Sequence, residues 1–415
     1  MLPFSPEQDA EVFRETLAKI PAASGVFLLR MKDDAGEPSL GKLETGSAEQ
    51  PAGGRRYGNE PYVSKSSNMR RRIARLLARK EDAGFSKRLN LRERCAAIEF
   101  TATGSDFENV LLLYRVLREH FPKTYAKRLR LSSPALIKID WENAYPRAYV
   151  TTRLGKLGGL NTYIGPFRSR AVADKYANDA LDLFKSRRCT FELNPDPSFP
   201  GCVYSEMKMC LAPCFKGCTD EEYMAETKRA EEFFTSHGAS VLGPLAASRD
   251  QASEKLEFEA AKQLHERVEK IKAIAREADE LVRRIDQLDC VVVQPSTDRD
   301  SVALFRFNAC QMCGPVTVST GETPVVAQEE GTSVPVETAV PKKLEGVLAE
   351  LEAAKKVSTA ECSEHLAILK RWYYRSHKAG EIVFRNADGS WPMRKLANAC
   401  ERVASGNREI GEVQS

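Results

Sequence analysis

The stretch CTFELNPDPSFPGCVYSEMKMCLAPCFKGC, residues 189–218, governs the interpretation of the whole chain because it holds five of the eleven cysteines. Four of them follow the spacing Cys189-x12-Cys202-x7-Cys210-x3-Cys214. Thiolates are soft ligands, so four of them at this density favour an iron-sulfur cluster or zinc. Structural zinc sites usually carry paired C-x2-4-C knuckles at both ends, whereas the first two cysteines here stand alone. The spacing therefore favours an iron-sulfur cluster, with zinc as the alternative.

Two further interpretations of these cysteines stay open. Cys218 is a fifth thiol that could replace Cys214 in the ligand set, and all of them could instead be buried thiols without a metal. Disulfides are not expected, because the first residues, MLPFSPEQDA, lack a signal peptide and no stretch approaches the roughly 20 apolar residues of a membrane span. We therefore expect a cytoplasmic protein without a membrane partner, in which clustered cysteines bind metal or do redox chemistry.

The size and charge of the chain set further bounds. A length of 415 residues predicts two or three domains. The net charge of +4 is too small to indicate a nucleic-acid partner by itself, so such a partner has to be argued from local clusters of charge.

The N-terminal part is predicted to be a small α/β module that ends near residue 135. Ser24–Arg30 and Pro61–Ser64 have the composition of strands, a basic helix begins near Asn68, and Asp106–His120 has the apolar face of a second helix. The polar segment between the two strands, Lys32–Glu60, is predicted to be a long hairpin insertion.

The rest of the chain is predicted to form three further units. Strands within residues 145–168 and a helix over 169–188 lead into the cysteines. Two helices over 239–274, with a break at 256–258, predict an αα-hairpin that docks a partner. The last part alternates strands, at 290–294 and 302–307, with helices at about 343–354 and 360–377, which predicts a small α/β unit.

A basic stripe follows the second predicted strand. Between Tyr62 and Arg94 eleven basic residues face three acidic ones. Such a stripe can neutralise phosphates of DNA, and the alternative is an ordinary solvated helix face. The residues predicted to contact DNA are Arg70, Arg71, Arg75, Arg79 and Lys80.

Four ordered landmarks make residues 12–275 similar to the UvrC excinuclease family of bacterial nucleotide excision repair. Gly25-Val-Phe27 and Tyr62-Val-Ser-Lys65 resemble the two halves of a GIY-YIG nuclease motif, and Tyr163-Ile-Gly-Pro-Phe167 resembles a second family motif. The cysteine spacing is similar to that of the family's iron-sulfur cluster, which implies a 4Fe-4S centre. Glu254-Lys-Leu-Glu-Phe-Glu-Ala-Ala261 resembles the motif that binds the helicase UvrB.

The resemblance implies a fold class and a domain order. The class is multidomain α/β: a GIY-YIG nuclease-like module at 12–135, a cysteine-cluster module at 136–235, a UvrB-binding-type helix pair at 236–280 and a small α/β region at 281–415. It also implies double-stranded DNA and a UvrB-like helicase as partners. The residues expected to contact that helicase are Leu256, Phe258, Ala261 and Leu264.

The resemblance also implies catalytic roles, which the sequence meets only in part. In the family a tyrosine activates water, a lysine and an arginine hold the phosphate, and a glutamate binds one Mg²⁺ or Mn²⁺ ion. Tyr62, Lys65 and Arg72 occupy the first three positions. Phe27 replaces a tyrosine, and Leu113, nine residues before Pro122, stands where the glutamate is expected. A leucine cannot bind a hard cation.

The sequence therefore supports two main hypotheses. The first is a shortened excinuclease that makes one metal-dependent incision in damaged duplex DNA; nothing in residues 290–415 resembles the family's second nuclease motif or its helix-hairpin-helix units. The second is a catalytically lapsed homologue that binds DNA and UvrB as an adaptor or regulator. A third, a structural metal protein with no nucleic-acid role, requires the ordered landmarks to be coincidental.

Overall fold

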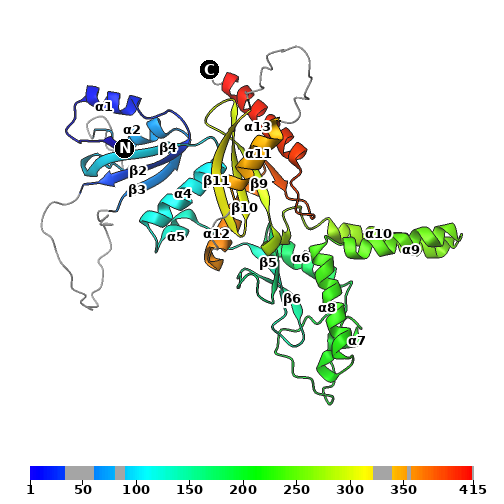
Figure 1. The fold of residues 1–415 in the computed structure, drawn as a ribbon. Coiled ribbons are helices and arrows are strands. Elements are labelled where there is room, and N and C mark those ends of the chain that lie inside the picture. The colour runs from blue at the N-terminus through cyan, green and yellow to red at the C-terminus, as the bar shows by residue number, and fades with distance from the viewer. Residues whose placement is uncertain (33–59, 80–88, 321–338, 353–356, 414–415) are drawn as a thin grey trace, which may run out of the picture.

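The computed structural model describes residues 1–32, 60–79, 89–320, 339–352 and 357–413, and the predicted insertion at 32–60 lies almost entirely outside them. Three antiparallel sheets follow one another along this part of the chain, each with helices against it (Figure 1). The predicted mixed α/β class is confirmed. No helix in the described ranges combines the length and the apolar character that a membrane crossing requires.

The first sheet has the strand order β1-β4-β2-β3 and lies between helices on its two faces. Its strands are β1 (Leu2–Pro3), β2 (Gly25–Met31), β3 (Tyr62–Ser66) and β4 (Cys95–Ala102). On one face, α2 (Met69–Leu76) buries Met69, Ile73 and Leu76 against the sheet, with α1 (Ala10–Ala18) beside it. The other face meets α4 (Asp106–His120), which Ser105 caps by accepting a hydrogen bond from the Glu108 amide.

The second sheet has the order β6-β5-β7-β8 and packs against α6 and α8. Its strands are β5 (Ala135–Asp140), β6 (Arg147–Thr151), β7 (Thr162–Phe167) and β8 (Arg283–Arg284), the last contributed from beyond the helix pair. The helices of this part of the chain are α6 (Arg170–Leu181), the short α7 (Val203–Glu206) and α8 (Asp220–Thr235), whereas α5 (Tyr125–Leu129) precedes β5 and packs against α4.

The prediction that the helix after Ser169 continues to Arg188 is wrong, because α6 ends at Leu181. The backbone of Lys185 hydrogen-bonds to other parts of the chain. Its amide donates to Glu226 Oε1 at 2.8 Å, and its carbonyl accepts from the Leu211 amide at 3.0 Å. These tertiary hydrogen bonds replace the ones that a longer helix would have made.

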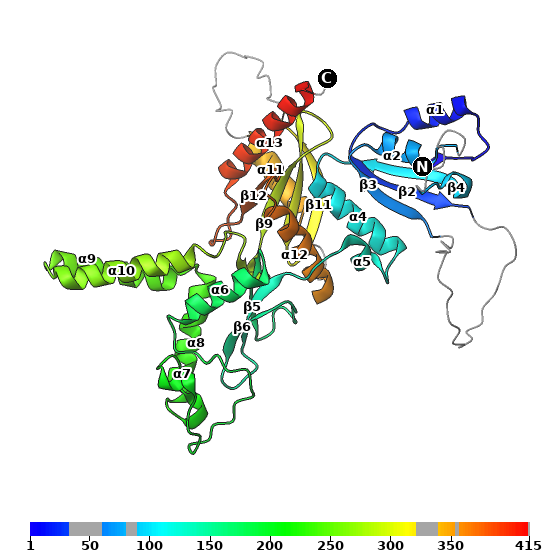
Figure 2. The same ribbon diagram turned by 180° about the vertical axis from the view of Figure 1, so that it is seen from behind.

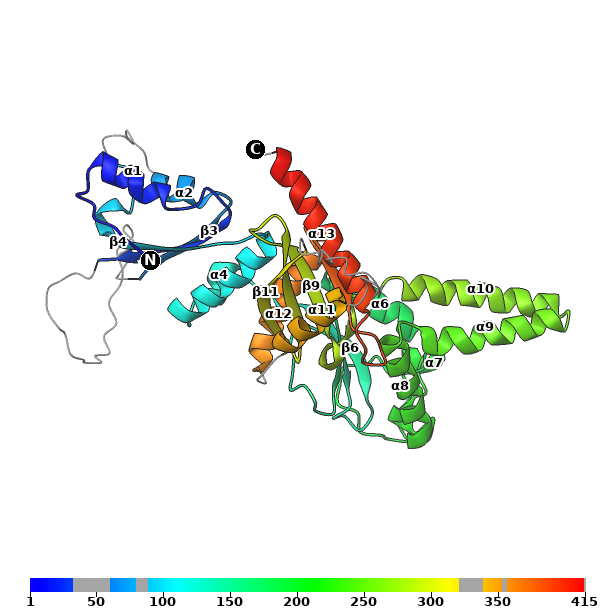
Figure 3. The same ribbon diagram turned by 45° about the horizontal axis from the view of Figure 1, so that its top comes forward.

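The predicted helix pair is confirmed as α9 (Ala239–Glu254) and α10 (Phe258–Ala275). The two helices run side by side and project from the body of the molecule, as Figures 1 and 3 show. The turn between them lies at the far end of this projection.

The third sheet has the order β11-β10-β9-β12 and is buried on both faces. Its strands are β9 (Cys290–Pro295), β10 (Ser301–Asn308), β11 (Gln311–Ser319) and β12 (Glu381–Phe384). One face packs against α11 (Ala339–Glu350) and α13 (Met393–Val413), the other against α12 (Thr359–Tyr373) and α4. Side chains alternate along β9, so Val291 and Val293 face α11 and α13 while Val292 faces α12.

Helix α4 therefore has two neighbours: it lies between the first sheet and the third, as both views in Figures 1 and 2 show. Phe107 of α4 makes edge contacts with Phe305 of β10 and Trp372 of α12, at ring-centroid distances of 5.0 and 5.5 Å. This helix joins the N-terminal and C-terminal units through one apolar core.

Candidate nucleic-acid interface and cysteine cluster

Two of the three predicted catalytic residues lie together. Arg72 on α2 points its Nη2 atom at the hydroxyl oxygen of Tyr62 on β3, at 3.5 Å. The Tyr62 ring is half-buried and packs beside the Phe27 ring on the α2 face of the sheet, with 6.2 Å between the centroids. The pair has the geometry in which an arginine could hold a phosphate next to a phenol.

Lys65, the third predicted catalytic residue, points away from that pair. Side chains alternate along β3, so Val63 and Lys65 face α4 whereas Tyr62 faces α2. Lys65 Nζ forms an ion pair with Asp106 Oδ1 at 2.5 Å, and Asp106 also pairs with Arg375 from the end of α12. The structure thus places Lys65 in a link between the first sheet and the C-terminal unit.

The α4 position expected to bind a metal ion is apolar in its surroundings as well as in its identity. Leu113 is half-buried and packs against the same core as Val63 and Phe107. Glu108, an acidic residue in the first turn of the same helix, accepts a hydrogen bond from the Gly104 amide at 2.9 Å, and burial raises the pKa of its carboxyl group. Neither residue provides a free carboxylate beside Tyr62.

The basic stripe separates into exposed and structural members. Arg71 and Arg75 are exposed one turn apart on α2. Arg70 is exposed but donates to the Ile20 and Ala18 carbonyls at 2.6 and 3.1 Å, and Arg79 donates to the Gln8 carbonyl at 3.1 Å. Lys80 lies outside the described residues. Arg71 and Arg75 are therefore the two predicted DNA-binding residues whose side chains donate to no backbone carbonyl in the described part of the chain.

Arg92, at the end of the same stripe, belongs to the core. It is 3 % exposed and donates to the carbonyl oxygens of Pro6, Leu77 and Gln8 at 2.9, 2.9 and 3.0 Å. Its guanidinium also lies over the Phe13 ring, 5.0 Å from the centroid. The stripe is thus a weaker basic surface than its composition indicates.

The four predicted metal-binding cysteines gather in one region around the loop that follows α6. Burial raises the pKa of Cys210 to about 11, and the neighbouring Cys189, Cys214 and Cys202 thiols act in the same direction. Within the described ranges, however, no three His, Cys, Asp or Glu side chains come close enough to hold a metal ion. The thiols are neighbours without forming a compact ligand group.

The surroundings of these thiols suit a negatively charged thiolate centre. Arg187 is 1 % exposed, and its Nη1 atom lies 3.5 Å from Cys189 Sγ. Its Nη2 atom is buried without a hydrogen-bond partner in the described structure. The Ala212 amide donates to Cys210 Sγ at 3.3 Å. A buried cation and an amide directed at sulfur would compensate the negative charge of thiolates at Cys189 and Cys210, two of the four predicted ligands.

The pKa shifts do not distinguish Cys218 from Cys214 as the fourth ligand, because burial raises the pKa of both thiols. Burial and then the carboxylates of Glu222 and Asp220 raise the pKa of the Cys218 thiol.

The end of the helix pair exposes apolar side chains. Leu256 is 70 % exposed with a left-handed φ of 61°, and Phe258 is 68 % exposed. Ala261 and Leu264 follow on α10 and are half-buried. The predicted partner-binding residues therefore cluster at and just behind the turn, where they are accessible to another protein.

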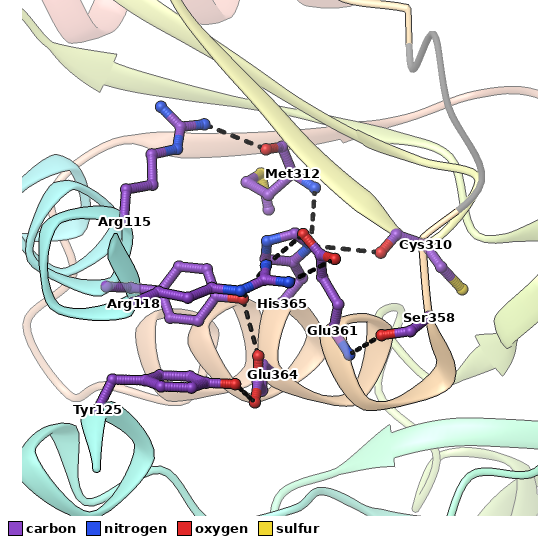
Figure 4. Close-up of polar contacts among 10 residues, drawn as sticks. Arg115, Arg118, Tyr125, Cys310, Met312, Ser358, Glu361, Glu364 and His365 are labelled. Atoms are coloured by element: carbon purple, nitrogen blue, oxygen red, sulfur yellow. Dashed lines mark hydrogen bonds and ion pairs between the residues drawn. The ribbon is translucent and has the colours of Figure 1, made fainter. Parts of the chain in front are cut away.

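The sequence did not indicate the polar joint between α4 and α12 that Figure 4 shows. The hydroxyls of Tyr114 and Tyr125 both donate to Glu364, at 2.8 and 2.6 Å. Arg118 pairs with Glu361, and its Nη2 atom lies 2.9 Å from the carboxylate. These partners are about 240 to 250 positions apart in the chain, so no local pattern could have revealed them.

Comparison with known proteins gives one family model and many relatives. Residues 135–233, which run from β5 into α8, match the model for the middle domain of UvrC/Cho excinucleases. The UvrABC system protein C of Bdellovibrio bacteriovorus is 29 % identical over 304 residues, 73 % of this chain and 42 % of that protein. The protein of the same name from Lactiplantibacillus plantarum is 31 % identical over 208 residues, 50 % of this chain and 32 % of that protein.

The UvrABC system protein C of Methanothermobacter thermautotrophicus is 25 % identical over 298 residues, 71 % of this chain and 45 % of that protein. The chain thus spans less than half the length of these curated relatives. No solved structure matches it.

Proposed function

We propose that this member of the UvrC family acts in nucleotide excision repair as a DNA- and UvrB-binding protein that does not itself cut DNA. This proposal rests on one observation: the nuclease-like module does not bring a metal-binding carboxylate and the predicted catalytic lysine together beside Tyr62. Leu113 stands in an apolar core, and Lys65 is paired with Asp106 on the opposite side of the sheet from Tyr62. A one-metal hydrolase needs a carboxylate ligand and a cation at the same phosphate.

DNA binding is assigned first to the exposed face of α2. Arg71 and Arg75 can reach phosphates without giving up a hydrogen bond to the protein. Binding through phosphate contacts releases counterions, so affinity for duplex DNA should fall as salt rises. The slope of log K against log salt is negative, and in the Arg71→Ala/Arg75→Ala variant it should become shallower by about 1 for each phosphate that the variant no longer touches.

The matched control for this experiment is Arg153→Ala/Lys156→Ala, which removes the same charge from exposed positions between β6 and β7. It should bind duplex as the unaltered protein does. Salt-independent binding, or equal losses of affinity in the two variants, would contradict the assignment to α2.

A second candidate function, a single metal-dependent incision, is favoured by the contact between Arg72 and Tyr62. The test is to incubate the protein, with and without UvrA and UvrB, with lesion-bearing duplex and Mg²⁺ or Mn²⁺. We expect no nick. A nick that the Tyr62→Phe/Arg72→Ala variant abolishes would replace the adaptor function with a nuclease function.

The UvrB contact is assigned to the exposed end of the helix pair. Phe258→Ala should abolish binding of UvrB measured by calorimetry, because aromatic side chains in such positions act as interface anchors. Val203→Ala removes another apolar side chain that is 57 % exposed, at α7, and serves as the control. Unchanged binding by Phe258→Ala would refute the assignment.

The cysteine quartet is proposed to hold an iron-sulfur cluster with a structural role between the nuclease-like module and the helix pair. Its residues would be Cys189, Cys202, Cys210 and Cys214, with Arg187 balancing their charge. Iron and zinc analysis, together with absorption at roughly 400 nm typical of iron-sulfur chromophores, distinguishes the cluster from zinc.

A further inference from the structure

A basic pocket lies where three parts of the chain meet, away from the α2 stripe and from the cysteines. It has a volume of about 440 Å³ and lies between the end of α5, the end of β7 and the outer side of α12. Its lining residues are Arg130, Leu131, Ser132, Arg168, Ala367, Lys370, Arg371 and Tyr374. Four of these eight side chains are cationic and none is a carboxylate.

The fold brings these cations together from distant positions. Arg130 ends α5 in a left-handed conformation with φ of 52°, and Arg168 follows the last residue of β7. Lys370 and Arg371 come from the last turn of α12, which packs against β7 and α4. Two hydrogen bonds connect the elements that form the pocket. Arg371 Nη1 donates to the Leu129 carbonyl at 3.4 Å, and the Tyr374 hydroxyl donates to the Pro166 carbonyl at 3.2 Å.

The cations of this pocket lack the acidic partners that their neighbours have. Just beyond the end of α12, Arg375 is paired with Asp106. In contrast, no ion pair joins Arg130, Arg168 or Lys370 to a carboxylate in the described ranges, and Lys370 is half-buried. Asp279 lies near the pocket, on the side of the Tyr374 hydroxyl. Burial lowers the pKa of Lys370, which is the expected cost of holding an ammonium group without a counterion.

We propose that this pocket binds a phosphate group, using Arg130, Arg168 and Lys370 as its cationic ligands. Converging guanidinium groups donate paired hydrogen bonds that match phosphate oxygens, and a concave cationic site concentrates anions. The phosphate could belong to a nucleic-acid strand or to a small polyphosphate. The inference that the phosphate comes from a nucleic-acid strand rests on the proposed DNA binding. The inference that the pocket binds a phosphate group does not.

The first experiment follows the reactivity of Lys370. The full-length protein is treated with an amine-acylating reagent, with and without inorganic tripolyphosphate or a duplex oligonucleotide, and acylation of each lysine is measured by mass spectrometry. We expect Lys370 to be protected several-fold while Lys156, which is exposed between β6 and β7, is not. Protection by duplex identifies a nucleic-acid phosphate, and protection by tripolyphosphate alone identifies a small ligand. Protection by neither overturns the proposal.

The second experiment uses the salt dependence of duplex binding. In the Arg168→Ala/Lys370→Ala variant, the negative slope of log K against log salt should become shallower by about 1 for each phosphate that the variant no longer touches. Arg153→Ala/Lys156→Ala is again the charge-matched control. If the α2 variant has a shallower slope and the pocket variant does not, the phosphate in the pocket does not come from nucleic acid, while the proposed DNA binding through α2 stands. If the unaltered protein binds no duplex, the proposed function fails and Lys370 protection by tripolyphosphate still decides the pocket.

Discussion

Two tyrosines at the contact between α4 and α12 donate to the same carboxylate but differ in burial. Their hydroxyls should therefore contribute different free energies to this contact, and the difference can be measured. Tyr114 is 1 % exposed, and its hydroxyl donates to Glu364 at 2.8 Å while accepting from Arg118 at 3.0 Å. Tyr125 donates to the same carboxylate at 2.6 Å but is only half-buried. The substitutions Tyr114→Phe and Tyr125→Phe remove the same atom from these two environments.

We expect Tyr114→Phe to destabilise the joint by about 1.5–3 kcal/mol, the range for hydrogen bonds to charged groups. The value should not be larger, because Glu364 keeps Tyr125 and Arg118 keeps Glu361 as partners. Tyr125→Phe should cost at most about 1 kcal/mol, since water can reach Glu364 from that side and replace the lost hydroxyl.

The measurement is native-state hydrogen exchange of the α4 and α12 amides, which reports local opening free energies without requiring two-state unfolding of a multidomain chain. Amides of the α9–α10 hairpin are the internal control and should be unaffected by either change. Equal costs for the two substitutions would contradict the predicted difference between the two tyrosines. A Tyr114→Phe effect below about 0.5 kcal/mol would show that the Tyr114 hydroxyl does not hold α4 and α12 together.

Three other predictions concern charged residues. Hydrogen bonding to Arg118 lowers the pKa of Glu361, so this ion pair stabilises the joint fully above the ordinary glutamate pKa. Its contribution should be lost as pH falls through the lowered value, seen as faster α12 exchange in acid. Arg92→Ala should destabilise the first module by about 3 kcal/mol, because the buried Leu77 carbonyl and the part-buried Pro6 and Gln8 carbonyls lose a charged donor, whereas Arg71→Ala should change its unfolding midpoint little. Arg187→Gln should release iron to a chelator faster than the unaltered protein; equal release would show that its charge does not support the cluster.

Many helices and strands could be predicted because their signals are local. The strand at β2, the helix α4 with its Ser105 cap and the break between α9 and α10 all follow from side-chain periodicity and capping within one segment. Strands β4, β5, β11 and β12 and helix α13 were not predicted. β4 and β12 carry little alternation of their own and are strands because β2 and β9 pair with them.

The site could be predicted only as a set of residue types. Spacing singled out Tyr62, Lys65 and Arg72 as one group, but the two-residue repeat of β3 places Lys65 on the other face of the sheet. Counting arginines likewise could not separate exposed Arg71 from buried Arg92, because accessibility depends on which carbonyls the fold brings near each guanidinium.

The cysteine spacing, the apolar residues Leu256 and Phe258 at the helix break and the absence of a glutamate at position 113 are determined by the sequence, because each depends on residue identity along one short segment. Only the tertiary structure decided which charges have partners. Asp106 pairs with both Lys65 and Arg375, the buried Arg187 lies beside Cys189, and Arg168 and Lys370 meet in a pocket without a carboxylate in its lining. Electrostatic interactions depend on distance in space, and the distances that matter here join residues far apart in the chain.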